Sequence, residues 1–374
     1  MARRAPSLTC LDFFAGSGLV TCALSPYFRS VWANDICPKK ARVFQANHGD
    51  VPFVLKSIAD IRGEDLPAAD LAWASFPCQD LSLAGPILGI NGQRSGLVWQ
   101  WLRVIDEMAR KPPVIVAENV SGLISAHRGQ NYSLLHDALV DRGYRAGPLL
   151  LDAIHFLPHS RPRVFVVAVR RDREIPADLT SSAPNWLHPT PLAGLAGCLD
   201  DLVWWRLAKP PRRRVSLGDF LDAGAPFHDA ATRDRNLALV PERSRRRLES
   251  LDGALAVAPG YRRMRSGRQT LEVRFDGVAG CLRTPRGGSS RQILVVKSRG
   301  QLQTRLLTAN ELRRLMGAPD SYKLPGSYNE IYHAMGDAVA VPVARYLARR
   351  LLAPLVESGL RSRARSGAFF RGAE

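Results

Sequence analysis

A cysteine follows a short apolar segment of the sequence and stands between a rigid residue and a polar amide. Residues 76–85 read FPCQDLSLAG, and the apolar run 71–74 comes directly before them. The thiol of Cys78 can act as a nucleophile if a neighbouring group supports it. A cysteine taken alone is more often a small, unreactive core side chain. The residues that end the other expected strands therefore help to decide whether Cys78 is a nucleophile or a core side chain.

Polar and small residues also end other apolar segments of the chain. They are Gly16, Ser17 and Gly18, then Asn34 and Asp35, and then Glu118 and Asn119. In an open parallel sheet, ligands bind at the carboxyl ends of the strands, so we expect these residues to share one site. Glycines let the backbone approach a ligand, and Asp35 suits hydrogen bonds to ribose hydroxyls. Asp60 and Ile61 end a further segment that could hold the edge of an adenine ring.

Strands and helices are expected to alternate in the first half of the chain. The expected strands are residues 8–14, 30–34, 71–75, 114–117 and 164–169, and the expected helices begin at 19 or span 38–47, 98–110 and 134–142. This alternation predicts an α/β fold with a doubly wound, mostly parallel sheet.

The alternation is lost after residue 173. Residues 174–300 are rich in proline and arginine, with weak strand signals near 270–275 and 293–297. Helical signals return at Thr308, which with Glu311 forms the pattern of a capping box.

Composition narrows the class of protein. The chain has 374 residues, of which 46% are hydrophobic, and no apolar run long enough for a membrane helix of ~18 residues. Its six cysteines show no CxxC spacing, which favours reduced thiols in the cytoplasm over disulfides or a zinc site. The net charge of +18 predicts attraction to a polyanion such as nucleic acid. The alternative is that the arginines are solvated on the surface and bind no polyanion.

The segment FPCQDLSLAG resembles the catalytic loop of the DNA (cytosine-5) methyltransferase family. Further segments resemble motifs of that family in the same order along the chain. They are residues 12–18 (its S-adenosylmethionine turn), 94–97 (Arg-Gly-Leu), 118–120 (Glu-Asn-Val), 159–163 (Gln-x-Arg-x-Arg), 307–320 and 336–343 (its last two blocks). Single matches of this length are weak, but this many in the same order are specific.

The resemblance implies a methyltransferase fold that uses S-adenosylmethionine. A discontinuous catalytic and cofactor-binding domain, residues 1–173 plus 301–374, would carry a smaller target-recognition domain at residues 174–300. The implied reaction moves a methyl group to C5 of cytosine in a specific sequence of double-stranded DNA, with the nucleotide flipped out of the duplex. Cys78 would bond to C6, Glu118 would hold or share the proton at N3, and Arg163 would bind the cytosine carbonyl. Arg161 would help to orient base and loop.

The same resemblance implies residues for the ligands. Those expected to bind the cofactor are Phe14, Ala15, Gly16, Gly18, Asp35, Ile36, Asp60, Ile61, Pro77, Leu97, Asp337, Ala338 and Val339. Those expected to bind DNA are Gln79, Ser82, Arg94, Arg212, Arg213 and Arg245. No metal and no membrane are expected. We expect a cytoplasmic, nucleoid-associated monomer, with a separately encoded restriction endonuclease as a candidate partner.

Four positions depart from the family pattern. Leu19 stands where the family often has another glycine, which a small turn can tolerate, and Asp35 replaces the usual Glu. His159 replaces Gln and is expected to loosen a loop contact, and Asp337 replaces Asn near the amino-acid end of the cofactor.

Three alternatives remain from the sequence. A related enzyme that methylates cytosine in tRNA would have the same Cys and Glu, and the long basic insert favours DNA over it. A non-catalytic DNA-binding relative is favoured only by Asp337. A nucleotide-dependent oxidoreductase would leave Cys78 and Glu118 without roles. The GxGxxG motif of dinucleotide-binding enzymes is also incomplete here, because Thr21 stands in place of its third glycine.

Overall fold

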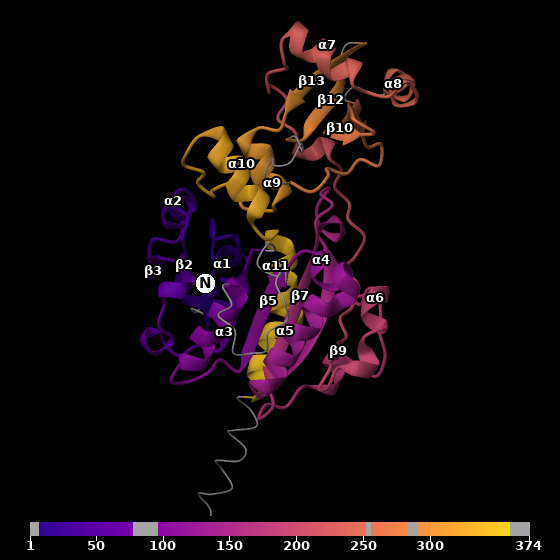
Figure 1. Cartoon of the computed structure of the whole chain (residues 1–374). Helices are drawn as coiled ribbons and strands as arrows, with labels where there is room; N and C mark the ends of the chain where they lie inside the picture. The colour runs from indigo at the N-terminus through magenta and orange to yellow at the C-terminus, as the bar shows by residue number, and fades with distance from the viewer. Residues whose placement is uncertain (1–6, 78–95, 252–255, 283–290, 299, 360–374) are drawn as a thin grey trace, which may run out of the picture. The chain divides into compact units, whose positions relative to one another are not determined.

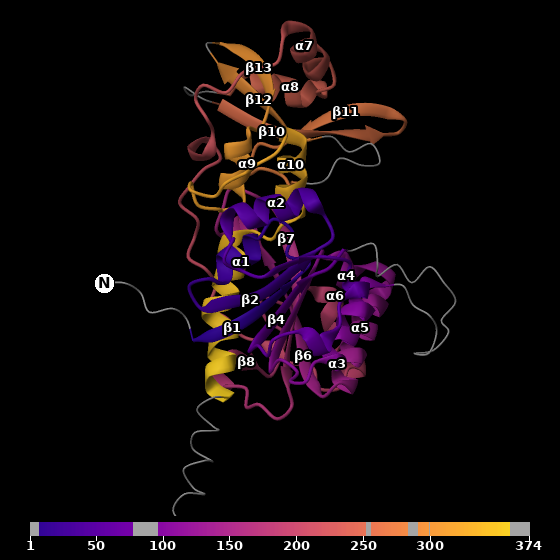
Figure 2. The ribbon, with the colours of Figure 1, turned by 90° about the vertical axis from the view of Figure 1, so that its left-hand side faces the viewer.

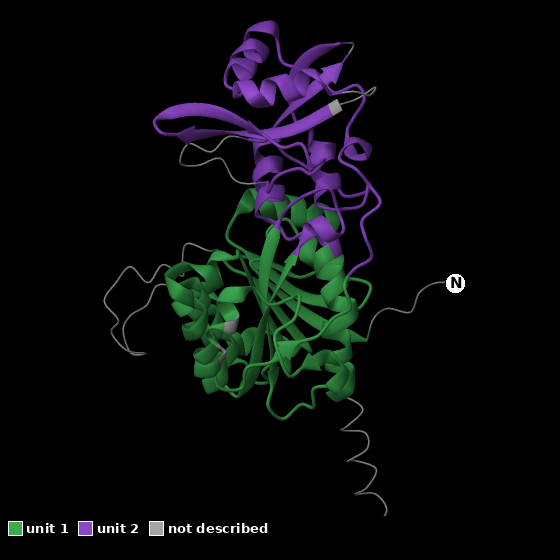
Figure 3. Cartoon of the chain, turned by 90° about the vertical axis from the view of Figure 1, so that its right-hand side faces the viewer, with its two compact units in different colours: residues 1–151, 162–209, 343–374 green, residues 152–161, 210–342 purple. Residues whose placement is uncertain are grey.

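The computed structural model describes residues 7–77, 96–251, 256–282, 291–298 and 300–359 (Figure 1). The chain divides into two compact units (Figure 3). Unit 1 comprises residues 1–151, 162–209 and 343–374, and unit 2 comprises residues 152–161 and 210–342. Residues 174–209 thus belong to the unit that holds the N-terminal sheet, and residues 301–342 to the other. The functional division into catalytic and recognition domains stays a prediction.

A seven-stranded sheet forms the centre of unit 1. In chain order its strands are β1 (Leu8–Phe13), β2 (Phe28–Asp35), β3 (Phe53–Leu55), β4 (Leu71–Ser75), β5 (Val114–Asn119), β6 (Tyr144–Asp152) and β7 (Pro162–Arg170). They lie in the order β3-β2-β1-β4-β5-β7-β6. The first five are parallel to their neighbours, and β7 runs antiparallel to β5. The predicted α/β fold with a mostly parallel sheet is confirmed.

Helices cover this sheet on both faces. Those of unit 1 are α1 (Leu19–Leu24), α2 (Pro38–Asn47), α3 (Leu97–Glu107), α4 (Gly122–Ser125), α5 (Gln130–Asp141), α6 (Thr190–Ala193) and most of α11 (Val341–Leu347), which continues through a π-turn at Ala348–Leu352. Figure 2 shows α3, α4 and α5 against one face and the yellow C-terminal helical segment against the other. Covered on both faces, β4, β5 and β7 are almost continuously apolar, as is typical of strands buried on both faces of a sheet.

Two strands of the sheet are not predicted from the sequence. β3 has only three residues, and β6 contains Gly147 and Pro148, which usually weaken a strand. The glycine is required, because a Cβ on it would lie 1.9 Å from the Val203 carbonyl oxygen. That close approach adjoins a small pair of strands, β8 (Thr180–Ser181) and β9 (Trp204–Trp205), and the Trp205 indole donates to the Gly147 carbonyl at 2.9 Å.

Unit 2 contains an antiparallel sheet with helices beside it. Its strands, in the order β11-β10-β12-β13, are β10 (Ala256–Arg265), β11 (Arg268–Val273), β12 (Ile293–Ser298) and β13 (Gln301–Leu306). Its helices are α7 (Ala230–Ala238), α8 (Glu242–Glu249), α9 (Ala309–Leu315) and α10 (Tyr328–Asp337). Leu237, Leu248, Leu271 and Val295 meet in its core.

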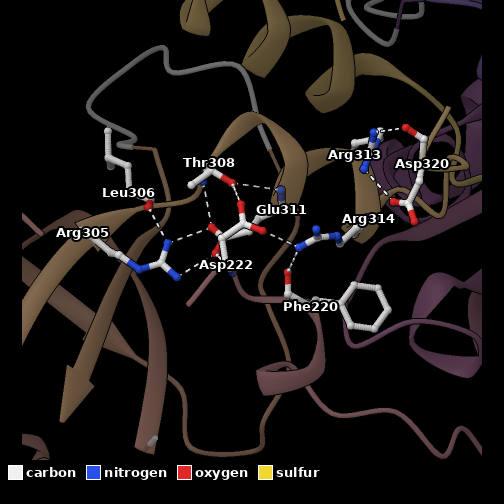
Figure 4. A network of polar contacts seen from close by, with 9 residues as sticks. All are labelled: Phe220, Asp222, Arg305, Leu306, Thr308, Glu311, Arg313, Arg314 and Asp320. Atoms are coloured by element: carbon white, nitrogen blue, oxygen red, sulfur yellow. Dashed lines mark hydrogen bonds and ion pairs between the residues drawn. The ribbon is translucent and has the colours of Figure 1, made fainter. Parts of the chain in front are cut away.

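A buried ion pair connects β13 to α9 in unit 2 (Figure 4). Arg305 donates to both carboxylate oxygens of Glu311, at 2.8 and 2.7 Å, and the two side chains are 4% and 0% exposed. The same carboxylate accepts from the backbone N–H groups of Thr308 and Asp222, each at 2.7 Å. Thr308 in turn caps α9, which confirms the predicted capping box. The Glu311 carboxylate is thus the shared acceptor of Arg305, Thr308 and Asp222, and its removal would leave these donors without their partner.

Removing Glu311 should therefore destabilise unit 2 strongly. We expect Glu311→Ala to lower the free energy of unfolding by about 3–5 kcal/mol, since it leaves the Arg305 guanidinium buried without its partner. Glu242→Ala is the matched control, because its ion pair with Arg246 is 69% and 77% exposed and should contribute only about 0–1 kcal/mol. Urea unfolding followed by circular dichroism measures both, and equal losses would contradict the expected dependence.

Candidate active site

The glycine turn after β1 is bonded to the end of β2. Phe14, Gly16 and Gly18 have φ of 56°, 57° and 81°, in the left-handed region that favours glycine. The N–H of Phe14 donates to the Asn34 side chain at 3.3 Å, and that of Gly16 to Asp35 Oδ2 at 2.9 Å. Two polar side chains at one strand end thus hold the turn after the neighbouring strand.

The end of β2 combines a carboxylate with exposed apolar surface. Asp35 is only 8% exposed, and its Oδ1 accepts from Cys37 N at 2.8 Å. Ile36 is 68% exposed, and Leu55, which pairs with Asp35 across β2 and β3, is 48% exposed. A carboxylate for ribose hydroxyls beside apolar side chains for a flat base fits an adenosine group, so these residues suit the cofactor implied by the sequence.

A buried carboxylate beneath this turn was missed in the sequence. Asp12 is fully buried, and its Oδ2 accepts from the Thr21 hydroxyl at 2.7 Å. Its Oδ1 is buried without a hydrogen-bond partner among the described residues. Burial raises the pKa of Asp12 to about 7, and the Asp35 charge adds to the rise. The signal was available, since an aspartate inside the apolar run LTCLDFF is unusual.

The remaining expected cofactor residues of unit 1 lie in different settings. Asp60 is exposed at the end of a short helical turn, Ile58–Asp60, and Ile61 is buried. Ser57, which sequence reasoning did not single out, follows β3 more closely and caps this turn by accepting from Ala59 N at 3.3 Å. Pro77 is exposed after β4, and Leu97 is half-buried at the start of α3. Ser57 therefore lies closer to the end of β3 than Asp60 does.

Glu118 and Arg163 come together across adjacent strands. Glu118 is the penultimate residue of β5, Arg163 is the second residue of β7, and Arg163 Nε lies 3.2 Å from Glu118 Oε1. Their side chains are 7% and 13% exposed. Arg163 also donates to the Pro162 carbonyl at 2.8 Å, which fixes its guanidinium. The arrangement offers a carboxylate and a cation side by side to a ligand that can both donate and accept hydrogen bonds.

Asn119 connects this pair to the segment that precedes Cys78. Its Nδ2 donates to the Phe76 carbonyl at 3.1 Å, and its Oδ1 accepts from Val120 N at 2.8 Å. The side chain is 3% exposed. Asn119 therefore holds the backbone from which Pro77 and Cys78 continue.

Arg161 and His159 bind backbone groups inside unit 2. Arg161, 2% exposed, donates to the carbonyls of Leu282, Gly336 and Ala338 at 3.0, 2.8 and 2.6 Å. The structure thus joins Arg161 to the expected cofactor segment Asp337–Val339. His159 donates from Nδ1 to the Leu315 carbonyl at 2.9 Å and accepts from Leu282 N at 3.2 Å. One donor and one acceptor are what a Gln amide offers, so the ring keeps two backbone contacts in place of that amide.

The expected DNA-binding residues are only partly described. Cys78, Gln79, Ser82 and Arg94 lie outside the described residues. Arg212 and Arg213 line a hollow of about 250 Å³ with Ile154 and His155. Arg245 is exposed on α8, 3.3 Å from Glu249.

Among the residues that the structure describes, no three or more His, Cys, Asp or Glu residues gather in a way that could hold a metal ion. None of the described helices combines the length and the apolar character needed to span a membrane.

Comparison with known proteins gives a consistent result. The family model of C-5 cytosine-specific DNA methylases matches residues 8–353. The type II methyltransferase M.Bsp6I of Bacillus sp. (strain RFL6) is 25% identical over 357 residues, covering 92% of this chain and 98% of the relative. M.HaeII of Haemophilus aegyptius is 26% identical over 344 residues, covering 91% and 92%. Among solved structures, the S. pombe Dnmt2 methyltransferase matches with a TM-score of 0.60 at 20% identity, covering 94% and 98% of the two chains, which supports the fold.

The two contacts of His159 predict how the position tolerates substitution. We expect His159→Gln to keep most of the stability, whereas His159→Leu leaves two buried backbone groups unpaired at about 1–3 kcal/mol each. Thermal unfolding followed by circular dichroism should give a melting temperature several degrees lower for the Leu variant than for the Gln variant. Equal melting temperatures would show that the ring contributes only by packing.

Asp12 predicts a pH dependence of stability. Its raised pKa means that the folded chain holds the proton more tightly than the unfolded chain, whose pKa is near 3.8. The contribution of Asp12 to stability is therefore present at pH below about 4 and is lost as pH rises to about 7. Urea unfolding across this range should show Asp12→Asn gaining stability relative to the unaltered protein as pH rises.

A second variant tests the cause. Thr21→Val removes a hydrogen bond that favours the charged form of Asp12, so the pKa of Asp12 in the folded chain should rise further, and the loss of stability, which still begins near pH 4, should be larger and extend to higher pH. Parallel pH profiles for all three proteins would contradict the assignment to Asp12.

Proposed function

The chain belongs to the C-5 cytosine-specific DNA methylase family, and we propose that it methylates C5 of cytosine in a specific sequence of double-stranded DNA through a covalent Cys78–C6 intermediate. Its membership makes it a methyltransferase enzyme that uses S-adenosylmethionine. The observation that carries the proposal is the pairing of Glu118 with Arg163, beside the asparagine that holds the segment before Cys78.

The chemistry requires an activated ring. C5 of cytosine is a poor nucleophile while the ring is aromatic, and bond formation between the Cys78 thiolate and C6 makes C5 resemble an enamine. C5 then takes the methyl group, the C5 proton leaves to a base or water, and the Cys78–C6 bond breaks to restore the ring. Bound S-adenosylmethionine supplies an electrophilic methyl group on a sulfonium.

Glu118 and Arg163 suit the two polar edges of the cytosine that change during this addition. A carboxyl group at N3 can hold a proton there, which draws electron density from the ring as the thiolate adds. A guanidinium can donate to the adjacent carbonyl oxygen and stabilise charge that gathers on it. Their mutual contact of 3.2 Å orients both side chains in advance.

The remaining polar residues would hold the backbone or the cofactor in place. Asn119 fixes the carbonyl of Phe76, which lies two residues before Cys78 in the sequence. Asp35, with Ile36 and the glycine turn, would hold the adenosine part of the cofactor. In unit 2, Arg161 orders the backbone of Gly336 and Ala338, the residues on either side of Asp337.

The substrate is proposed from the relatives and the charge. Relatives such as M.Bsp6I are named type II methyltransferases, which supports a DNA substrate and a separately encoded restriction endonuclease of the same specificity as partner. The net charge of +18 suits a polyanion. The cytosine must leave the duplex to reach Cys78, which costs a few kcal/mol and is the reason for proposing base flipping.

Expression in a methylation-free bacterium followed by base-resolution methylation sequencing tests the proposal. We expect 5-methylcytosine at one short sequence, and none with Cys78→Ala. Purified Glu118→Gln should lower kcat by about 10²- to 10⁴-fold, because the proton at N3 is no longer shared with a carboxyl group. Glu64→Gln, at an exposed glutamate of the same unit, is the matched control and should keep the rate.

Two results would contradict the proposal. Transfer of tritiated methyl groups to tRNA but not to duplex DNA would assign the other substrate. Duplexes with 5-fluorocytosine at the methylated position should become covalently trapped on the protein with its methyl donor, and failure to trap would exclude the Cys78 intermediate.

A further inference from the structure

The strands β10 and β11 extend beyond the rest of the sheet in unit 2 as a two-stranded ribbon (Figure 2). Pairing of β10 with β12 ends at Gly260, whereas pairing with β11 continues to Arg265 and Arg268. Ser266 and Gly267 close the ribbon with φ of 46° and 74°. A two-residue turn with both φ values positive gives a narrow tip that matches the strand twist.

The base of the ribbon is held firmly within unit 2. The Tyr261 hydroxyl lies 2.7 Å from the Cys281 carbonyl and 2.7 Å from the Gln292 side-chain oxygen. The Leu271 N–H donates to the Leu239 carbonyl at 2.7 Å, and Arg262 donates to the buried Asn236. The tip is thus an exposed projection on a fixed support.

The two faces of the tip differ in chemistry. Side chains alternate along a strand, so Arg263, Arg265 and Arg268 share one face, while the cross-strand pair Met264 and Gln269 lies on the other. All five are exposed, and Met264 is 53% exposed although it is apolar. The methionine offers an adaptable apolar contact, and the glutamine amide offers a donor and an acceptor to a partner that can pair with both.

The arginine face is not neutralised by the protein. The face contains three arginines, Arg263, Arg265 and Arg268, and one acid, Glu272, for a net charge of +2. Glu272 pairs with both Arg263 and Arg265, at 3.1 and 2.5 Å, and Arg268 makes no ion pair with any residue that the structure describes. On α8, by contrast, Arg245 and Arg246 each have a glutamate one turn away, and Arg247 lies 4.3 Å over the Phe275 ring.

We propose that the tip of this ribbon, residues 263–270, enters the major groove of the substrate DNA, with Gln269 and Met264 toward the base edges and Arg263, Arg265 and Arg268 toward the phosphates. This inference rests on the proposed function and names the element that recognises the sequence. The major groove is about 12 Å wide and admits a two-stranded ribbon, and a Gln amide can bind adenine with two hydrogen bonds. Exposed cations on the opposite face supply affinity without sequence preference.

Gln269→Ala tests the base contact. Methylation sequencing should show relaxed specificity at one base pair of the recognition sequence, by about 5- to 150-fold. Gln301→Ala, an exposed glutamine on β13, is the matched control and should keep the wild-type pattern.

Arg268→Ala tests the phosphate contact. Its affinity for duplex DNA, measured by fluorescence anisotropy at several salt concentrations, should fall for all sequences, and the slope of log affinity against log salt should decrease by about 1. Arg349→Ala, an exposed arginine of unit 1, should leave the slope unchanged.

The outcomes separate this inference from the proposed function. If the wild-type protein methylates DNA but both ribbon variants keep its specificity and salt slope, the ribbon is not the recognition element. A lower slope for Arg268→Ala with unchanged specificity for Gln269→Ala would overturn the assignment of the base-facing side. If the wild-type protein methylates no DNA, the proposed function fails, and the salt slope of Arg268→Ala alone decides whether the ribbon binds duplex DNA.

Discussion

The site in unit 1 depends on side chains at strand ends that bond the backbone of a neighbouring connection. Asn34 and Asp35 end β2 and hold the turn after β1, and Asn119 ends β5 and holds the backbone after β4. In each case the strand that supplies the side chain lies next to the strand whose connection it fixes, as the sheet order requires. The parallel arrangement thus brings these ends to one edge, and short polar side chains there convert loose connections into fixed ones. The pairing of Glu118 with Arg163 adds the charged groups to the same framework.

Much of this framework follows from sequence, because continuous apolar segments and the residues after them carry strong local signals. Strands β1, β4, β5 and β7, helix α2 and the capping box at Thr308 are of this kind. β6 was missed because its glycine and proline oppose a strand locally, and only the carbonyl of Val203 explains why a glycine stands there. β10 was missed for a similar reason, since Pro259 and Gly260 interrupt its pattern. Long-range packing, which a single sequence does not display, decides both.

Site residues show the same limit. Motif order identified Glu118 and Arg163, and the structure brings them into contact. Motif order also identified Arg161, but not its bonds to three carbonyls more than a hundred residues away along the chain. The structure likewise shows how His159 replaces Gln, since its two ring nitrogens meet one carbonyl and one N–H. The imidazole thus binds one carbonyl and one N–H, which are contacts that a Gln amide could also make.

The arginines illustrate why composition alone leaves the partner question open. A net charge of +18 suggests a polyanion, yet Arg161 and Arg305 are buried and use their guanidinium groups on carbonyls and on Glu311. Those side chains add to the long-range field while their guanidinium groups bind partners within the protein. Arg245 and Arg246 are exposed but each has a carboxylate beside it. What distinguishes Arg268 is the absence of any ion pair with the residues described, together with its place on a projecting tip. Charge predicts that a partner exists, and the geometry of individual arginines predicts where it binds.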